Sequence, residues 1–415
     1  MTWIKLAIRN LFRNYRRSLF TVLAIGLGFA AVNILGGFTA YIFNNLRDSF
    51  IYLQANGHLT VFNAGFLEEG KLNPTKYLLD EKETKLIEDI IRRYPEVLVI
   101  TPQLNISGLL SNGKVSTIFL AAGRVPSDVR LISSHARGMI ATLQTFNGRP
   151  LEDNVTYGVG LSRGLAKQFK FDVGSNPIAM SSTVSGQVNA VDTQVFQLFD
   201  SSNEALDDKL MLVPLKFAQE LYDTTSVDRI NILLDRTDMT DDVRERLSKD
   251  FSDAGLQVDI KTWNELNPFY TKVRNMFQVI FLFAFLIVFT IVVMSVINTV
   301  SMAIMERTRE IGTLRALGLK RRGIERLFAM ESMFLGIIGS VLGIILTLVA
   351  WAAIMTLKPT WVPPQIASRI PLEVYLVPEY MAFSLVSLVV LSLLAASLPA
   401  RKAARMQIVS ALGHA

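Results

Sequence analysis

Four long runs without a charged residue alternate with polar segments along this 415-residue chain. The runs contain 29, 31, 26 and 21 residues in order. A helix of about 20 apolar residues is long enough to cross the hydrocarbon core of a bilayer. The pattern therefore predicts four transmembrane helices, at residues 18–46, 275–305, 332–357 and 380–400.

The longest polar segment, residues 47–274, is large enough for one or two compact domains. Helical periodicity over Asp80–Arg93 and Thr240–Ala254 is mixed with strand-like runs such as Gln194–Phe199. We therefore expect an integral membrane protein with four transmembrane helices and a large mixed α/β domain. The remaining polar segments are short, at residues 1–17, 306–331, 358–379 and 401–415.

The charge distribution predicts the topology. Residues 1–17, 306–331 and 401–415 together carry 15 basic and 4 acidic side chains, although the whole chain has a net charge of only +6. Loops with an excess of Lys and Arg remain on the cytoplasmic side of a membrane. Both termini and residues 306–331 are thus expected in the cytoplasm, with 47–274 and the short 358–379 loop on the outside. The basic residues follow membrane topology, so we expect no nucleic-acid partner.

Residues 1–17 alternate apolar side chains with five basic ones, which is typical of an amphipathic helix that lies in the membrane interface. A basic start followed by an apolar run is also the general form of a signal peptide. The 29-residue run that follows is too long for the apolar part of such a peptide. We therefore favour a cytoplasmic amphipathic helix and an uncleaved first span.

A charged segment separates the second and third apolar runs and reads Glu-Arg-Thr-Arg-Glu-Ile-Gly-Thr-Leu-Arg-Ala-Leu-Gly from Glu306 to Gly318. Its apolar residues recur at close to helical spacing, which predicts an amphipathic helix at the membrane surface. A basic loop that only fixes the topology is the alternative. The apolar face consists of Ile311, Leu314 and Leu317, and the polar residues are Glu306, Arg307, Arg309, Glu310 and Arg315.

This segment closely resembles the coupling region of the MacB, LolC/LolE and FtsX family of ABC transporter permeases. Looser similarities to the same family lie at residues 158–166, 206–221 and 399–405. The resemblance implies that residues 306–331 are a coupling helix and loop that contact a separate ATPase. It assigns that contact to Glu306, Arg307, Arg309, Glu310, Ile311, Leu314, Arg315, Leu317 and Gly318.

The resemblance also implies a function, in which ATP hydrolysis by a partner ATPase dimer drives work outside the membrane. Extraction of a lipoprotein or membrane lipid from a bacterial inner membrane is the interpretation that we favour. MacB-like mechanotransmission through a periplasmic adaptor, and FtsX-like control of a cell-wall hydrolase, are the alternatives. Expected partners are the ATPase dimer, a second permease copy or paralogue, a periplasmic carrier or adaptor, and lipid.

Several chemical classes find no support in the sequence. There is no cysteine, and the three histidines lack metal-ligand spacing. The chain has no Walker A motif and no GxSxG motif, so we expect no catalytic residue and no metal here, with ATP and Mg²⁺ bound by the partner. Within the spans, Gly339 and Gly343 form a GxxxG helix-packing motif. The polar Asn33 and Asn298 are expected to face other helices.

Overall fold

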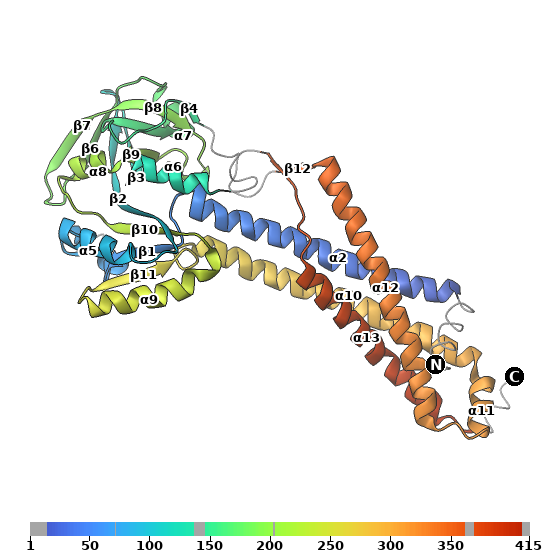
Figure 1. Ribbon diagram of the computed structural model, residues 1–415. Helices are drawn as coiled ribbons and strands as arrows, with labels where there is room; N and C mark the ends of the chain where they lie inside the picture. The colour runs from blue at the N-terminus through green and yellow to red at the C-terminus, as the bar shows by residue number, and fades with distance from the viewer. Residues whose placement is uncertain (1–14, 71, 137–145, 202–203, 362–368, 409–415) are drawn as a thin grey trace. The chain divides into compact units, whose positions relative to one another are not determined.

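The computed structural model divides into two compact units (Figure 1). We call residues 1–43, 273–359 and 372–415 the helical unit, and residues 44–272 and 360–371 the α/β unit. The N-terminal amphipathic helix expected at 1–17 falls almost wholly outside the described residues. The structure describes residues 15–70, 72–136, 146–201, 204–361 and 369–408.

Within the described residues, four helices are long and apolar enough to cross a membrane, as expected from the sequence. The fold class, four such helices and a large mixed α/β domain, is therefore confirmed. At about 1.5 Å per residue, the 39 residues of α10 extend over about 58 Å, well beyond a hydrocarbon core of about 30 Å. The helices are α2 (Tyr15–Asp48), α10 (Pro268–Glu306), α12 (Arg321–Leu357) and α13 (Pro378–Arg405), with the short α11 (Thr308–Ala316) after α10.

Glycines allow α12 to approach α2 closely. A Cβ atom added to Gly339 would lie 2.6 Å from the Cβ of Ile25, and one added to Gly343 would lie 2.5 Å from the Cβ of Phe29. Small residues have this role in membrane helices, where close packing replaces the hydrophobic effect. The GxxxG motif thus lies directly at the contact between α12 and α2.

The two asparagines of the spans have different environments. Asn33 of α2 is buried, and its side chain donates a hydrogen bond to the Phe29 carbonyl oxygen at 2.9 Å. The expectation for this residue is confirmed. Asn298 of α10 is instead exposed on the surface of the chain. No helix that the structure describes covers Asn298, because the buried side of α10 is formed by residues such as Val296 and Val300. That it faces a helix therefore stays a prediction, which only a helix of another chain could fulfil.

The α/β unit is built on one mixed sheet (Figure 1). Its main order is β11-β1-β10-β2-β3-β9-β5-β8-β4, and β6 and β7 extend from β2. A separate small pair, β12 (Thr360–Trp361) and β13 (Ile370–Pro371), comes from the loop between α12 and α13. The strands of the sheet are β1 (Leu59–Asn63), β2 (Val97–Ser111), β3 (Ser116–Arg124), β4 (Phe146–Gly148), β5 (Gly158–Ser162), β6 (Ile178–Ser182), β7 (Val188–Asp192), β8 (Gln194–Phe199), β9 (Leu210–Pro214), β10 (Arg229–Leu234) and β11 (Val258–Thr262).

The helices of this unit cover the sheet and enclose two main apolar cores. One core contains Phe119 and Phe217, and the other contains Ile87 and Phe251. Asp80 begins α5 with a capping box, in which its side chain and that of Glu83 each accept a backbone N–H. The helical segments are η1 (Ser49–Leu53), α3 (Phe66–Glu69), α4 (Pro74–Tyr77), α5 (Glu81–Ile91), α6 (Pro126–Ser134), α7 (Arg163–Phe169), η3 (Glu204–Leu206), α8 (Leu215–Tyr222), η4 (Thr237–Met239) and α9 (Thr240–Asp253).

Candidate functional site: the segment between α10 and α12

The chain turns sharply between α10 and α12, and the short helix α11 lies in this turn (Figure 1). Arg307 has a non-helical backbone conformation, with φ −112° and ψ 17°, and separates α10 from α11. Gly318 has φ +96°, a value that favours glycine, and it allows the chain to leave α11. The expected helix is therefore present, and it forms a distinct corner with α10.

The apolar residues of this segment do not share one surface. Ile311 is only 2% exposed and joins an apolar cluster with Ile304, Ile324 and Phe328 from α10 and α12. Leu317 is 80% exposed and Leu314 is 38% exposed. Ile311 therefore stabilises the helical unit itself, and the apolar surface left for a partner consists of Leu314 and Leu317.

Three of the charged residues bind other parts of the helical unit. Arg17 of α2 forms an ion pair with Glu306. The Arg315 guanidinium donates a hydrogen bond to the carbonyl oxygen of Met406, the residue that ends α13. Arg307 pairs with Glu331 of α12. The segment is thus connected to α2, α12 and α13 by side chains that sequence analysis assigned to an external partner.

Arg307 makes the most buried of these contacts. Its Nη1 lies 3.0 Å from Glu331 Oε1, and its Nε lies 3.1 Å from Glu310 Oε2. The side chains of Arg307 and Glu331 are 14% and 9% exposed. The guanidinium carbon also lies 5.9 Å from the centre of the Phe328 ring, within the range of a cation–π contact. One side chain thus joins α10, α11 and α12.

The surface that remains exposed is both charged and apolar. Arg309 and Glu310 are exposed on α11, next to the exposed Leu314. Met305, at the end of α10, is 66% exposed and adds to the apolar part. Such a mixed patch on a short helix can contact a partner protein through both its apolar and its charged side chains.

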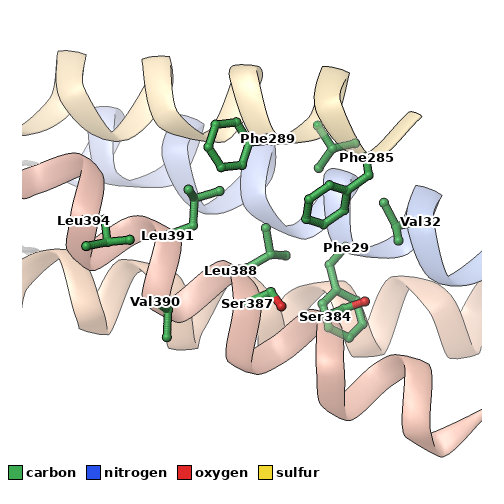
Figure 2. A pocket seen from close by; sticks show the side chains of 11 residues that line it. Phe29, Val32, Phe285, Phe289, Ser384, Ser387, Leu388, Val390, Leu391 and Leu394 are labelled. Atoms are coloured by element: carbon green, nitrogen blue, oxygen red, sulfur yellow. The ribbon is translucent and has the colours of Figure 1, made fainter. Parts of the chain in front are cut away.

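An apolar cavity of about 260 Å³ lies among α2, α10 and α13 of the helical unit (Figure 2). Its walls include the rings of Phe29, Phe285 and Phe289. The polar lining residues are Ser384 and Ser387, both from α13. The cavity is therefore suited to an alkyl chain or another apolar group and not to a charged one. The remaining lining residues are Val32, Val288, Leu388, Val390, Leu391 and Leu394.

In the α/β unit, a polar network holds the segment that follows η1. The Arg124 guanidinium donates hydrogen bonds to Gln103 Oε1 at 2.8 Å, to Asn56 Oδ1 at 2.9 Å and to the carbonyl oxygen of Gln54. Burial, with the positive charge of Arg229 nearby, lowers the pKa of Arg124 to about 10. The side chain therefore stays protonated at neutral pH and fixes residues 54–56 to the end of β3.

His58 is fully buried beside this network. The Leu234 backbone N–H donates to its Nδ1 at 3.0 Å, so the neutral ring carries its proton on Nε2 and donates to Thr237 Oγ1 at 3.0 Å. Burial, together with the positive charge of Arg47, lowers the pKa of His58 to about 4. A neutral ring that makes both hydrogen bonds is a structural residue.

The described residues contain no group of three His, Asp or Glu side chains that could hold a metal ion. The residue that sequence analysis missed is Glu331, which directly precedes the third apolar run. No pattern in the sequence identifies Arg307, 24 residues earlier, as the partner of this carboxylate. The exposure of Met305 could not be predicted from the sequence either, because it depends on how α10 packs against the other helices.

Two family models match the chain. The MacB-like periplasmic core domain matches residues 18–250, which are more than half of the chain. The FtsX-like permease C-terminal model matches residues 282–408, which include α11. The chain belongs to the MacB-like and FtsX-like family of ABC transporter permeases.

The permease is similar to several proteins of this family. The ABC transporter permease YtrF of Bacillus subtilis is 38% identical over 106 residues, which are 25% of this chain and 23% of the relative. The pyoverdine export ATP-binding/permease protein PvdT of Pseudomonas syringae pv. tomato is 35% identical over 117 residues, 28% of this chain and 16% of the relative. The macrolide export ATP-binding/permease protein MacB of Escherichia coli K12 is 29% identical over 159 residues, 38% of this chain and 23% of the relative. The permease thus spans less than a quarter of the length of each of these three relatives.

Two solved structures show weak similarity to the permease. The periplasmic region of MacB from Actinobacillus actinomycetemcomitans has a TM-score of 0.37 and 14% identity, and the match covers 51% of this chain and 91% of that one. The extracellular domain of the transporter YknZ from Gram-positive bacteria has a TM-score of 0.35 and 13% identity, with 50% and 100% covered.

Proposed function

We propose that a separate ATPase dimer, which binds ATP and Mg²⁺, drives this permease through α11 at the cytoplasmic face of a bacterial inner membrane. The observation that carries the proposal is the exposure of Leu317 and Leu314 on the segment that resembles the coupling region of the family. The neighbouring Arg309 and Glu310 supply polar contacts around this apolar surface. The 15 basic residues of the predicted cytoplasmic segments support this orientation.

Replacing Leu317 with Asp tests the ATPase contact, because the substitution places a charge on a surface that a partner must desolvate. We expect the variant to insert and fold normally but to lose the ATPase that co-purifies with the native permease in mild detergent. Leu72→Asp, at a leucine that is 88% exposed in the α/β unit, is the matched control and should retain the ATPase. An ATPase that co-purifies equally with both variants would contradict the proposal.

We further propose that two permease chains pair along α10. This helix is the most hydrophobic of the four, yet only 11% of its most apolar 18-residue stretch is buried within the chain. It carries the exposed Asn298, eight residues before the charged end of the span, between Met294 and Met302. An amide in contact with lipid is unfavourable, and asparagine side chains form hydrogen bonds between membrane helices. A second copy placed against this face would supply a partner for Asn298.

Because the chain has no cysteine, pairing can be tested with a single introduced one. Asn298→Cys should form a disulfide-linked dimer under mild oxidation in the membrane. Ile338→Cys, at a residue of α12 that is 47% exposed, is the control and should remain monomeric. Equal cross-linking at both sites would indicate random collision and contradict pairing along α10. Cross-links of Asn298→Cys to a different chain would identify a mixed pair.

We propose a membrane lipid or the acyl chain of a lipoprotein as the cargo. The apolar cavity among α2, α10 and α13 supports this class, because it lies within the apolar spans and its walls are almost entirely hydrocarbon. Ser387→Trp would fill the cavity and should abolish the retention of lipid or acylated protein during purification. Val386→Trp, at a residue that is 59% exposed and does not line the cavity, is the control. Retention that is unchanged by Ser387→Trp would contradict the assignment.

Export through a periplasmic adaptor is the second candidate. Two similar proteins, PvdT and MacB, are named for the export of pyoverdine and of macrolides. A protein adaptor that co-purifies with the permease, in the absence of lipid or acylated protein, would favour export over lipid extraction.

A further inference from the structure

The corner between α10 and α11 is held by one buried ion pair. Arg307 is the residue at which the helical backbone is interrupted, and its side chain reaches Glu331, 24 residues later on α12. Glu331 is 7% exposed as a residue and lies one turn beyond Phe328, whose ring also contacts Arg307. The interrupted backbone alone would leave α11 free to pivot. The Arg307 side chain therefore adds a buried restraint at the corner, beside the hydrogen bond of Arg315 to Met406 and the packing of Ile311.

We propose that the Arg307–Glu331 pair is a latch that fixes the angle between α11 and α10, so that a push on α11 moves the long helix and is not absorbed by bending at the corner. The inference deepens the proposed function, because a rigid corner matters only if force enters at α11. Arg307 is thereby a positioning residue of the coupling region and not a contact for the ATPase.

Three observations support the proposal that the Arg307–Glu331 pair acts as a latch. The pair is buried, so it is weakly screened by water and salt. The guanidinium is a planar fork that binds Glu310 and Glu331 with different nitrogen atoms, which restricts its orientation. Ile311 packs into the apolar cluster directly beneath, so a movement of α11 away from α12 would expose this side chain as well as separate the ions. Polar and apolar contacts therefore oppose the same bending motion.

The latch can be measured on the permease alone, without its ATPase. Cysteines that replace Thr290 of α10 and Thr313 of α11, both exposed, can each carry a spin label. Pulsed electron paramagnetic resonance spectroscopy in lipid nanodiscs then measures the distance between the two labels across the corner. Dilution of the labelled chain with unlabelled chain removes distances between copies. We expect one narrow distance distribution in the otherwise native chain. In Glu331→Gln and in Arg307→Gln this single distance should be lost and replaced by a broad distribution.

The double variant and two controls make the result specific. Arg307→Gln combined with Glu331→Gln should broaden the distribution no more than either change alone, because residues that act as one unit are not additive. Glu325→Gln is a matched control, since Glu325 lies on α12 and forms no ion pair with any residue that the structure describes. Labels at Val349 and Val386, on α12 and α13, should keep their distance in every variant, which a general loss of structure would not allow.

Three results would contradict the proposal that the Arg307–Glu331 pair fixes the corner. These are a narrow distribution that persists in both single variants, additive effects in the double variant, or equal broadening between the α12 and α13 labels. If Arg307→Gln fails to fold, Arg307→Lys keeps the charge but not the fork and should still broaden the distribution. A latch that behaves as expected in a permease that binds no ATPase would leave this inference standing and contradict only the proposed function.

Discussion

Arg315 of α11 donates a hydrogen bond from its guanidinium to the carbonyl oxygen of Met406, where α13 ends. The last carbonyl groups of a helix have no partner within the helix, and a cation there also interacts favourably with the helix dipole. The contact therefore stabilises the end of α13 and ties it to the candidate coupling helix.

Replacing Arg315 with Ala should destabilise the last turn of α13 by about 1 kcal/mol, because this cap is lost. Hydrogen–deuterium exchange of the amides at residues 400–406 should become faster by roughly fivefold, the equivalent of this free energy. Arg321→Ala removes an exposed arginine at the start of α12 and is the control. Unchanged exchange in Arg315→Ala would show that the hydrogen bond contributes nothing to the helix end.

Acid should destabilise the permease through His58. Its pKa is about 4 in the folded chain, below the ordinary value of 6.5, because burial and Arg47 disfavour the charged ring. A histidine whose pKa is lowered on folding contributes its full stability above pH 6.5 and loses it as the pH falls towards 4. The loss should approach about 3 kcal/mol at the acid end of this window.

The measurement is chemical unfolding of the full chain in detergent between pH 7.5 and 4.5. His58→Asn should be less stable than the native chain at pH 7.5, but its stability should fall less steeply with acid. If the native chain and His58→Asn lose stability in parallel, the titration of His58 does not govern the acid sensitivity.

Gly339→Ala should destabilise the helical unit by about 2 kcal/mol, because the new methyl group would lie 2.6 Å from the Ile25 Cβ and force α2 and α12 apart. Ile25→Gly removes the opposing atoms. In a double-mutant cycle measured by thermal unfolding in detergent, the two changes should therefore show a coupling free energy of about 1 kcal/mol or more. Strict additivity would mean that the two residues are not in contact.

Arg124→Lys should loosen the segment that follows η1. Lysine keeps the positive charge but cannot form the three divergent hydrogen bonds to Gln54, Asn56 and Gln103. We expect a loss of about 2 kcal/mol in the free energy of unfolding and faster hydrogen–deuterium exchange at residues 54–57. Arg130→Lys, at an exposed residue of α6, should change neither quantity. If the amides of residues 54–57 remain protected from exchange in Arg124→Lys, the hydrogen bonds of Arg124 are not what restrains this segment.

Much of the fold could be predicted because its signals are local. The lengths of the four uncharged runs predicted the four long helices. In the α/β unit, Gln194–Phe199 forms β8 over the expected residues, and Asp80 caps α5. The expected strand–helix–strand order near the end of this unit is also present, although β1 lies between β10 and β11 and pairs with both. That inserted strand comes from about 170 residues earlier, which no local pattern indicates.

The sequence by itself determined that this chain crosses the membrane with four helices, carries a large α/β domain and has a short amphipathic helix between its second and third spans. Run length, charge and periodicity are properties of residues that are close in sequence, so they can be recognised without a structure. Only the tertiary structure decided that Ile311, Arg307 and Arg315 contact their own chain while Leu317 remains exposed. Helical periodicity tells which residues share a face, but the helices packed against α11 decide which face is buried and which carboxylate Arg307 meets.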